Sequence, residues 1–248
     1  MEIKRYAEIA GKFPREIVLL KSSGCGWGKC AFCDYWTDAE SDLDRCGAFN
    51  QAILGQVKGS LGVLEVINSA SFDEFPEQTV RDILKVCAEK GIRIFISEQH
   101  FRYRASLPAI RDAFARIGAE CAFILSVETF DEDLRERVFR KGLGSLDPAD
   151  LAREYQWVNL LCGVKGQTLA SIIRDITLGM ELFERVNVNM FIPNTTHFER
   201  DPGLIEAFYT SAFFDALKDK PTVEILDKDD SRTSDHLGFL GYPEHPDA

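Results

Sequence analysis

The stretch Glu16-Ile-Val-Leu-Leu20-Lys-Ser-Ser-Gly-Cys25-Gly-Trp-Gly-Lys-Cys30-Ala-Phe-Cys33 places three cysteines in a loop directly after a short apolar run. The apolar run predicts a strand buried on both faces, so the loop would begin at the carboxyl end of that strand. In a reducing compartment, clustered cysteines are more often metal ligands or redox groups than disulfide partners. Three thiolates can hold a metal centre and leave one coordination position open for chemistry.

Outward from this loop, the chain alternates short apolar runs with longer amphipathic ones. This alternation is typical of strand-helix units around a parallel sheet. Strands are predicted at Ile17–Leu20, Val63–Ile67, Arg93–Ile96, Cys121–Val127, Val158–Cys162 and Val186–Ile192, with a seventh at Thr222–Leu226. Helices are predicted at Leu43–Lys58, Glu77–Lys90, Leu107–Ile117, Glu132–Phe139, Thr168–Phe183 and Pro202–Lys218. The predicted fold is α/β, a partial (β/α)6 barrel with an extra C-terminal strand. It forms a single domain over 1–248, with its core at about 16–200 and a C-terminal extension at 201–248.

The length, composition and charge of the chain narrow the classes of function that it could have. The chain has 248 residues, 45% of them hydrophobic and 28% charged, which is ordinary for a globular protein. With 29 basic and 40 acidic residues, the formal net charge is −11, which opposes sequence-independent binding to nucleic acid. No stretch approaches the ~20 apolar residues of a membrane span, and the start Met1-Glu-Ile-Lys-Arg-Tyr6 lacks a signal or transit pattern. We therefore expect a cytoplasmic protein that acts on a small molecule.

Polar residues follow most of the predicted strands. Because the carboxyl ends of parallel strands meet at one end of a barrel, we expect these residues to converge there. After the cysteine loop they are Asn68-Ser-Ala-Ser71, Ser97-Glu-Gln-His100, Glu128-Thr129, Gly163-Val-Lys-Gly-Gln-Thr168 and Pro193-Asn-Thr-Thr-His197.

The four remaining cysteines are isolated along the chain at Cys46, Cys87, Cys121 and Cys162. An odd total of seven, without paired spacing, does not indicate a disulfide framework. Free cysteine is among the most buried residue types, so we expect these four to be small hydrophobic core residues.

Three kinds of centre could use the cysteine loop. A structural zinc site needs four protein ligands, usually as two pairs, and the loop offers three. A plant-type two-iron ferredoxin has the same spacing of four and then two residues, and Cys46 or Cys87 could be its distant fourth ligand. The third is a 4Fe-4S cluster held by three cysteines, with its fourth iron open to another ligand.

For this third centre the chain resembles the radical S-adenosylmethionine (SAM) superfamily, which places a three-cysteine loop after the first strand of a partial strand-helix barrel. The family spacing is usually three and then two residues, and we expect Gly26 and Gly28 to accommodate the extra residue here. Three further segments resemble family segments in the same order along the chain. They are Leu64–Ser71, Ser126–Gly142 and Val158–Thr168.

The resemblance implies two cofactors, a 4Fe-4S cluster and SAM, and roles for named residues. Cys25, Cys30 and Cys33 would hold the cluster and act catalytically through it. Phe32 and Val164 would lie against the adenine, and Ser126 and Glu128 would meet the ribose, unless Glu128 only pairs with Arg140 or Lys141. The remaining cofactor-binding candidates are Asn68, Ser69, Ala70 and Glu98.

The segment from Cys25 to Trp36 looks most like the queuine lyase group of this superfamily. The resemblance implies reductive cleavage of SAM to a 5′-deoxyadenosyl radical, which abstracts hydrogen from queuosine 5′-phosphate so that queuine is released. Phosphate would meet Lys21, His100, Arg102 and Lys165, and the base or sugar would meet Asp34, Asn159, Asn189 and Asn194.

The predicted partners are the nucleotide-like substrate, an electron donor such as flavodoxin or ferredoxin, and a second copy of the chain in a homodimer. The alternatives are another radical SAM enzyme, acting as an activase or on tRNA, and a non-enzymatic iron-sulfur or zinc protein.

Overall fold

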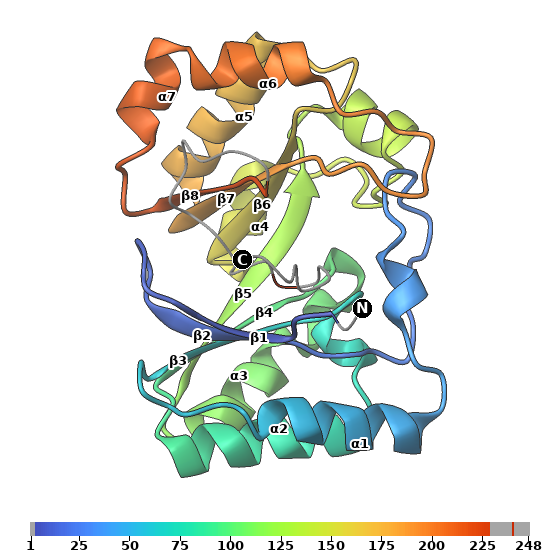
Figure 1. Ribbon diagram of the computed structural model, residues 1–248, viewed down its shortest axis with the longest axis vertical. Coiled ribbons are helices and arrows are strands. Elements are labelled where there is room, and N and C mark those ends of the chain that lie inside the picture. Colours follow the sequence, from blue (N-terminus) through green and yellow to red (C-terminus); the bar gives the residue numbers. More distant parts are fainter. Residues whose placement is uncertain (1–2, 229–239, 241–248) are drawn as a thin grey trace. The chain divides into compact units, whose positions relative to one another are not determined.

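A computed structural model of the chain describes residues 3–228 and Leu240 (Figure 1). Within them, residues 3–26, 35–123 and Leu240 form one unit, and residues 27–34 and 124–228 form a second. Strand β5 (Glu120–Glu128) begins in the first unit and ends in the second. The single domain over 1–248 stays a prediction, and most of the charged segment after Asp227 lies outside the described residues.

The first unit has four strands in sequence order. They are β1 (Tyr6–Ile9), β2 (Arg15–Leu19), β3 (Val63–Ile67) and β4 (Ile94–Glu98). Strand β1 is antiparallel to β2, whereas β2, β3 and β4 are parallel. The helices are α1 (Leu43–Leu54), α2 (Glu77–Lys90) and α3 (Leu107–Ala115), with the 3-10 turns η1 (Tyr35–Asp38), η2 (Phe72–Glu74) and η3 (Phe101–Ser106). Helices α1, α2 and α3 lie on one face of the strands (Figure 1).

The second unit repeats this arrangement with parallel strands only. After β5 come β6 (Trp157–Cys162), β7 (Arg185–Met190) and β8 (Val223–Leu226), each paired with the strand before it. The helices are α4 (Pro148–Glu154), α5 (Leu169–Leu182), α6 (Pro202–Tyr209) and α7 (Ala212–Leu217), and η4 (Leu134–Val138) is a π-helical turn. Helix α5 packs against β6 and β7.

All seven predicted strands are present, with bounds shifted by one or two residues at some ends. The helix predicted at Glu77–Lys90 is confirmed as α2, and Gly91 caps it in the left-handed conformation at φ 66°. Among the described residues, no helix is long and apolar enough to cross a membrane.

Four features differ from the sequence predictions. Strand β1 was not expected, because four residues carry little periodic signal and the strand exists through its pairing with β2. Helix α4 was also missed. The helix predicted at Glu132–Phe139 is only the π turn, closed by the bond from the Phe139 amide to the Leu134 carbonyl at 2.9 Å.

The helix predicted at Pro202–Lys218 is divided into α6 and α7. The break is at Thr210-Ser211, where the Ser211 hydroxyl accepts a hydrogen bond from the Phe214 amide at 3.2 Å and caps α7.

A buried ion pair joins two strands of the first unit. Arg15 on β2 and Glu65 on β3 are 1% and 4% exposed, and the Arg15 Nε contacts the Glu65 Oε2. The Arg15 Nη1 also donates to the Phe13 carbonyl at 2.9 Å. Because Ile17 is paired with Glu65, and Arg15 is two residues before Ile17, both charges face the same side of the sheet.

Breaking this pair should destabilise the protein strongly, because a buried charge loses its partner. We expect Glu65→Gln to lower the free energy of unfolding by about 3–5 kcal/mol. Urea denaturation measures the change. Glu77→Gln, which removes one end of the exposed pair with Arg81, should change it by less than about 0.5 kcal/mol. Equal losses in the two variants would contradict this assignment.

Candidate active site

The first part of the cysteine loop, through Cys25 and Gly26, belongs to the first unit and is held by Glu74. The Glu74 Oε1 accepts hydrogen bonds from the Gly26 amide and, at 2.8 Å, from the Tyr103 hydroxyl. Its backbone carbonyl accepts from the amide and hydroxyl of Ser23 at 3.1 and 3.0 Å. One residue of η2 therefore fixes the backbone on both sides of Cys25.

Tyr103 is held in the same contact. Burial, followed by the hydrogen bond to Glu74, raises the pKa of Tyr103 to about 12. Its hydroxyl therefore remains protonated at neutral pH and keeps donating to the carboxylate.

The second part of the loop, from Trp27 to Asp34, belongs to the second unit and rests on the turn after η4. The Trp27 Nε1 donates to the Arg140 carbonyl, and the Ala31 amide donates to the Phe139 carbonyl, both at 2.9 Å. The Asn194 side chain donates to the Phe32 carbonyl at 2.8 Å. The backbone around Cys30 and Cys33 is thus held by two segments more than 100 residues further along the chain.

An apolar bed lies under Cys30 and Cys33. Phe32 makes edge contacts with Phe139 and Phe198, at ring centroid distances of 5.3 and 6.5 Å. The buried members of the bed are Phe32, Phe139, Leu161, Val164 and Phe191. Such a shell limits water near a metal centre and lowers the local dielectric.

The two glycines that flank Trp27 differ in why a side chain is disfavoured there. Gly28 has φ +56°, the kind of unusual backbone angle expected of both. Gly26 does not have a positive φ, but a Cβ atom there would lie 2.6 Å from the Glu74 Oε1. That these glycines accommodate the extra loop residue stays a prediction.

The seven cysteines fall into two classes. Cys25, Cys30 and Cys33 are partly exposed, whereas Cys46, Cys87, Cys121 and Cys162 are buried, as predicted. Burial raises the pKa of all four buried thiols, to about 12 for Cys87 and Cys121. The three loop thiols are thus the accessible ones, and Cys30 and Cys33 among them also pack against the apolar bed, which fits the donor set of an iron-sulfur cluster. In the described part of the chain, no three His, Cys, Asp or Glu side chains form a ready-made metal cage.

The loop after β3 places the next candidates in the first unit. Asn68 bonds within its own turn, accepting from the Ala70 amide at 3.0 Å and donating to the Ser71 carbonyl at 3.1 Å. The Ser69 hydroxyl lies 3.1 Å from the Ser22 hydroxyl in the loop after β2. The loops after β2 and β3 are therefore directly linked. Glu98 ends β4 and is half-buried.

The cationic candidates of the first unit have internal partners. The Lys21 ammonium lies 3.8 Å from Asp38 and 5.1 Å from the centre of the Phe49 ring. The His100 amide donates to the Ser71 hydroxyl at 3.1 Å, and the Arg102 guanidinium donates to the Gly26 carbonyl. Arg102 thus contacts the cysteine loop and His100 contacts the loop after β3, whereas Lys21 lies beside a carboxylate.

Glu128 ends β5 in a strained conformation in the second unit. It has φ +71° and lies at a bulge that begins at Ser126. Its Oε1 is 2.7 Å from the Lys141 ammonium, and both side chains are buried. Lys141 also lies 6.0 Å from the Phe32 ring centre, which places Glu128 near the cysteine bed. The pairing with Lys141 is therefore present. Left-handed conformations of side-chain-bearing residues cluster at functional sites.

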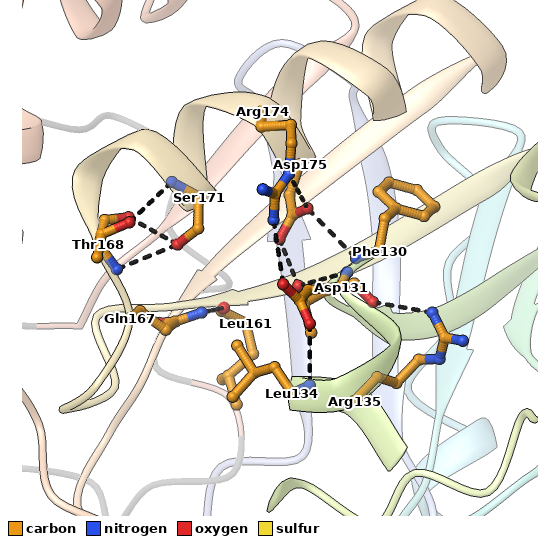
Figure 2. A network of polar contacts seen from close by, with 11 residues as sticks. Phe130, Asp131, Leu134, Arg135, Leu161, Gln167, Thr168, Ser171, Arg174 and Asp175 are labelled. Carbon is orange, nitrogen blue, oxygen red and sulfur yellow. Dashed lines mark hydrogen bonds and ion pairs between the residues drawn. The ribbon is translucent and has the colours of Figure 1, made fainter. Parts of the chain in front are cut away.

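A polar network holds the turn that follows Glu128 (Figure 2). Asp175 on α5 accepts hydrogen bonds from the Thr129 hydroxyl at 2.5 Å and the Phe130 amide at 3.3 Å. Arg135 donates to the carbonyls of Thr129 and Gly144 at 3.4 and 2.7 Å. The turn is therefore tied to a helix on one side and to the following loop on the other.

Burial raises the pKa of Asp175, even though the bond from Thr129 and the charge of Arg174 oppose this shift. The carboxyl group of an aspartate in the unfolded chain has a pKa of about 3.9. Because the pKa of Asp175 is higher in the folded protein, the protonated carboxyl group adds to the free energy of unfolding below about pH 3.9. This contribution is lost as the pH rises through the folded pKa. At neutral pH the network thus holds a carboxylate that burial disfavours.

The loop after β6 is held by the side chain of Gln167, which Figure 2 also shows. The Gln167 side chain accepts from the Val164 amide at 2.9 Å and donates to the Leu161 carbonyl at 2.8 Å. This places Val164, 1% exposed, in the same apolar bed as Phe32. Two residues predicted to lie against adenine are thus brought together.

The other candidates of the second unit fall into two groups. Ser126 and Asn159 are bonded to each other at 3.0 Å, and Asn189 lies half-buried on β7. Asp34 accepts from the Thr195 amide and hydroxyl, each at 2.9 Å, so it supports the cysteine loop as Asn194 does. Lys165 is exposed and forms a 2.8 Å ion pair with Glu199 on the surface.

Sequence reasoning missed the two residues that organise these loops, Glu74 and Asp175. Glu74 follows Ser71 at the spacing of a capping box, which is visible in the sequence. Its contacts with Gly26 and Tyr103 depend on folding. Asp175 lies within an amphipathic helix pattern and gives no comparable local signal.

The two classes of cysteine should separate by alkylation. We expect iodoacetamide to modify Cys25, Cys30 and Cys33 of the metal-free folded protein. Cys87 and Cys121 should remain intact, because both are buried and burial raises the pKa of each thiol to about 12. Peptide mass spectrometry reads the sites, and the urea-unfolded chain should label at all seven. Equal rates at Cys87 and at the loop would contradict the assignment.

Asp175→Ala should lower the free energy of unfolding by about 1–3 kcal/mol, because the Thr129 hydroxyl and Phe130 amide lose their acceptor. Asp175→Asn keeps one acceptor oxygen and removes the buried charge, so this variant should lose less free energy of unfolding than Asp175→Ala. Wild type should also lose stability relative to Asp175→Asn as the pH rises from about 4. Denaturation at several pH values tests both points. The exposed control Asp150→Asn should stay within about 0.5 kcal/mol.

Comparison with known proteins gives a result only at the level of structure. No protein-family model and no curated protein matches the sequence. A solved structure of a queuine lyase from Clostridium spiroforme bound to SAM and queuine matches with a TM-score of 0.85 and 33% identity. The match covers 90% of this chain and 95% of that one. Streptococcus suis SuiB matches with a TM-score of 0.52 and 15% identity, over 84% of this chain and 48% of that chain, which concerns the fold alone.

These matches confirm the predicted partial barrel fold and the prediction that the chain is an enzyme. They also confirm the prediction of a 4Fe-4S cluster and SAM as the cofactors of its superfamily. At 33% identity over nearly the full length of both chains, this protein belongs to the queuine lyase group of the radical SAM superfamily.

Proposed function

We propose that this protein releases queuine from queuosine 5′-phosphate by cleaving the glycosidic bond, in a reaction that begins with hydrogen abstraction from the ribose phosphate. The observation that carries the proposal is the match to the C. spiroforme queuine lyase, which was solved with SAM and queuine bound. The three partly exposed loop cysteines, two of which (Cys30 and Cys33) pack against the apolar bed, support it independently.

In this proposal Cys25, Cys30 and Cys33 hold the cluster. When bound, the cluster and SAM supply the radical that takes the hydrogen atom. The bed around Phe32 and Val164 excludes water from the thiolates and offers an apolar face to adenine. The backbone around Cys25 is held by Glu74, so the first ligand keeps its orientation without a bound metal.

Glu128 would accept hydrogen bonds from the ribose hydroxyls of SAM, with Ser126 beside it. A charged acceptor strengthens such bonds, and the Lys141 ammonium 2.7 Å from the Glu128 Oε1 gives the buried carboxyl group an ion-pair partner. Asn68, Ser69 and Ala70 would receive the methionine end, in a turn whose shape the Asn68 side chain fixes, and Glu98 would add a polar contact.

For the substrate, His100 and Arg102 are the stronger phosphate candidates, because Arg102 is bonded to the cysteine loop and His100 to the neighbouring loop after β3 in the first unit. Lys21 and Lys165 each have a carboxylate beside them, which partly offsets their charge. Asn159 and Asn189 would meet the base or sugar, whereas Asp34 and Asn194 would act through the loop that they support.

A flavodoxin or ferredoxin as electron donor, a homodimer, and a cytoplasmic location complete the proposal. They rest on the family resemblance and on the sequence expectations given above.

The test uses anaerobically reconstituted protein with SAM, a reductant and queuosine 5′-phosphate. Wild type should produce both queuine and 5′-deoxyadenosine, measured by liquid chromatography and mass spectrometry. Cys30→Ala should abolish both products, because one iron loses its ligand. The matched control Cys87→Ala removes a buried thiol and should retain both.

Other outcomes select the alternatives. Formation of 5′-deoxyadenosine without queuine from wild type would indicate another radical SAM substrate, such as a protein or tRNA. Zinc in place of iron and sulfide would indicate a structural metal protein. Normal 5′-deoxyadenosine production by Cys30→Ala would remove the cysteine loop from the mechanism.

A further inference from the structure

A row of three polar side chains crosses the second unit, formed by Ser126 on β5, Asn159 on β6 and Asn187 on β7. The strand register pairs Ser126 with Asn159, and Asn159 with Asn187. Neighbouring strands are ~4.8 Å apart, so the polar row spans about 10 Å. We expected Ser126 and Asn159 at the active site, whereas Asn187 lies within an apolar-rich strand and was not singled out.

The polar row faces away from the helix that covers these strands. A Cβ atom at Gly179 of α5 would lie 3.1 Å from Val186 and 3.5 Å from Val158. The side chains of Val186 and Val158 therefore point toward α5. Because successive side chains of a strand alternate, Asn187 and Asn159 point to the opposite face.

The hydrogen bonds in the polar row run in one direction. The Asn187 Nδ2 donates to the Asn159 Oδ1 at 2.9 Å, and the Asn159 Nδ2 donates to the Ser126 hydroxyl oxygen at 3.0 Å. Among the described residues, the Asn187 Oδ1 is a buried acceptor with no hydrogen-bond partner, in a side chain 4% exposed. Buried polar groups are normally paired, so an orphaned acceptor requires an explanation.

The charges around this acceptor restrict what could satisfy it. Glu224 on β8 is paired in register with Asn187 and is 2% exposed. The nearby cation, Arg185, lies 3.9 Å from Glu224, donates to the Pro221 carbonyl at 3.0 Å and stacks 4.9 Å from the Trp157 ring centre. The Asn187 oxygen needs a hydrogen-bond donor and has Glu224 on the neighbouring strand, so an anionic group such as phosphate would not satisfy it. The oxygen favours an N–H donor.

Two side chains beside Asn187 on the same face are partly exposed. Asn159, in the middle of the polar row, is only half-buried. Asn189 is two residues further along β7 on the same face and is also half-buried. A ligand lying along Asn159 and Asn189 would therefore meet the edge of Asn187.

We propose that Asn187 is a specificity-determining residue whose Oδ1 accepts a hydrogen bond from an N–H group of the substrate's base. The bond from its Nδ2 to Asn159 fixes the amide so that the oxygen presents the lone pair. This inference rests on the proposed function, because it takes the base to be that of a queuine nucleotide. A neutral polar row of this kind binds the base, and the phosphate is bound elsewhere by the cationic loops.

The experiment measures binding without turnover. Queuine is titrated by calorimetry into anaerobically reconstituted protein with SAM and no reductant. Asn187→Ala should raise the Kd of queuine by about 5- to 150-fold, as expected for loss of one buried hydrogen bond. The Kd of SAM, titrated separately, should change by less than about 2-fold.

Two further variants separate binding from packing. Val188→Ala is the matched control, because it trims the next side chain of β7 on the opposite face, and it should leave the Kd of queuine within about 2-fold. Asn187→Leu removes the amide at similar volume and should weaken queuine binding at least as much as Asn187→Ala.

The outcomes are distinct. If wild type binds queuine and both Asn187 variants bind it equally well, the assignment of Asn187 is overturned while the proposed function stands. If both Asn187 variants weaken queuine and SAM binding alike, Asn187 supports the fold and the assignment is likewise overturned. If wild type binds SAM but not queuine, the proposed substrate and this inference both fail.

Discussion

The carboxylate of Glu74 is the contact on which the start of the cysteine loop depends. The loop keeps its three thiols partly exposed, so hydrogen bonds to its backbone must hold it. Glu74 supplies these bonds around Cys25 in the first unit, and its contact with Tyr103 extends them to η3. In the second unit, Asn194 and the turn after η4 do the same around Cys30 and Cys33. Each half of the loop is thus prepared for metal by its own set of contacts.

The second constraint is the conformation of Glu128. A glutamate at φ +71° is unfavourable unless its surroundings determine it. The bulge in β5, the ion pair with Lys141 and the Asp175 network behind Thr129 act together at this point. The protein retains a buried aspartate and a strained residue in neighbouring positions, which is typical of a site where geometry has been selected over stability.

Much of the fold could be predicted from local patterns, and the residues show why. Buried parallel strands are nearly continuous apolar runs, so Val63–Ile67 and Val158–Cys162 could be recognised without tertiary information. Strand β1 and helix α4 could not, because they are short and depend on their neighbours. The charged stretch Glu132–Phe139 has helical composition, but bonds from Arg135 to Thr129 and Gly144 fold it into a single π turn.

By itself, the sequence determined the parts of the site whose chemistry lies in spacing or side-chain type. These are the three clustered thiols, the aromatic residue before Cys33, the isolated cysteines that became buried, and the order of strand-helix units. Only the tertiary structure decided which polar residues became supports and which kept an open hydrogen-bonding group. Asn194 and Asp34 became supports of the loop, whereas the Asn187 oxygen has no hydrogen-bond partner within the described part of the chain. The physical reason is that hydrogen-bond satisfaction depends on partners distant in the chain, and no local pattern records which partners fold against a given side chain.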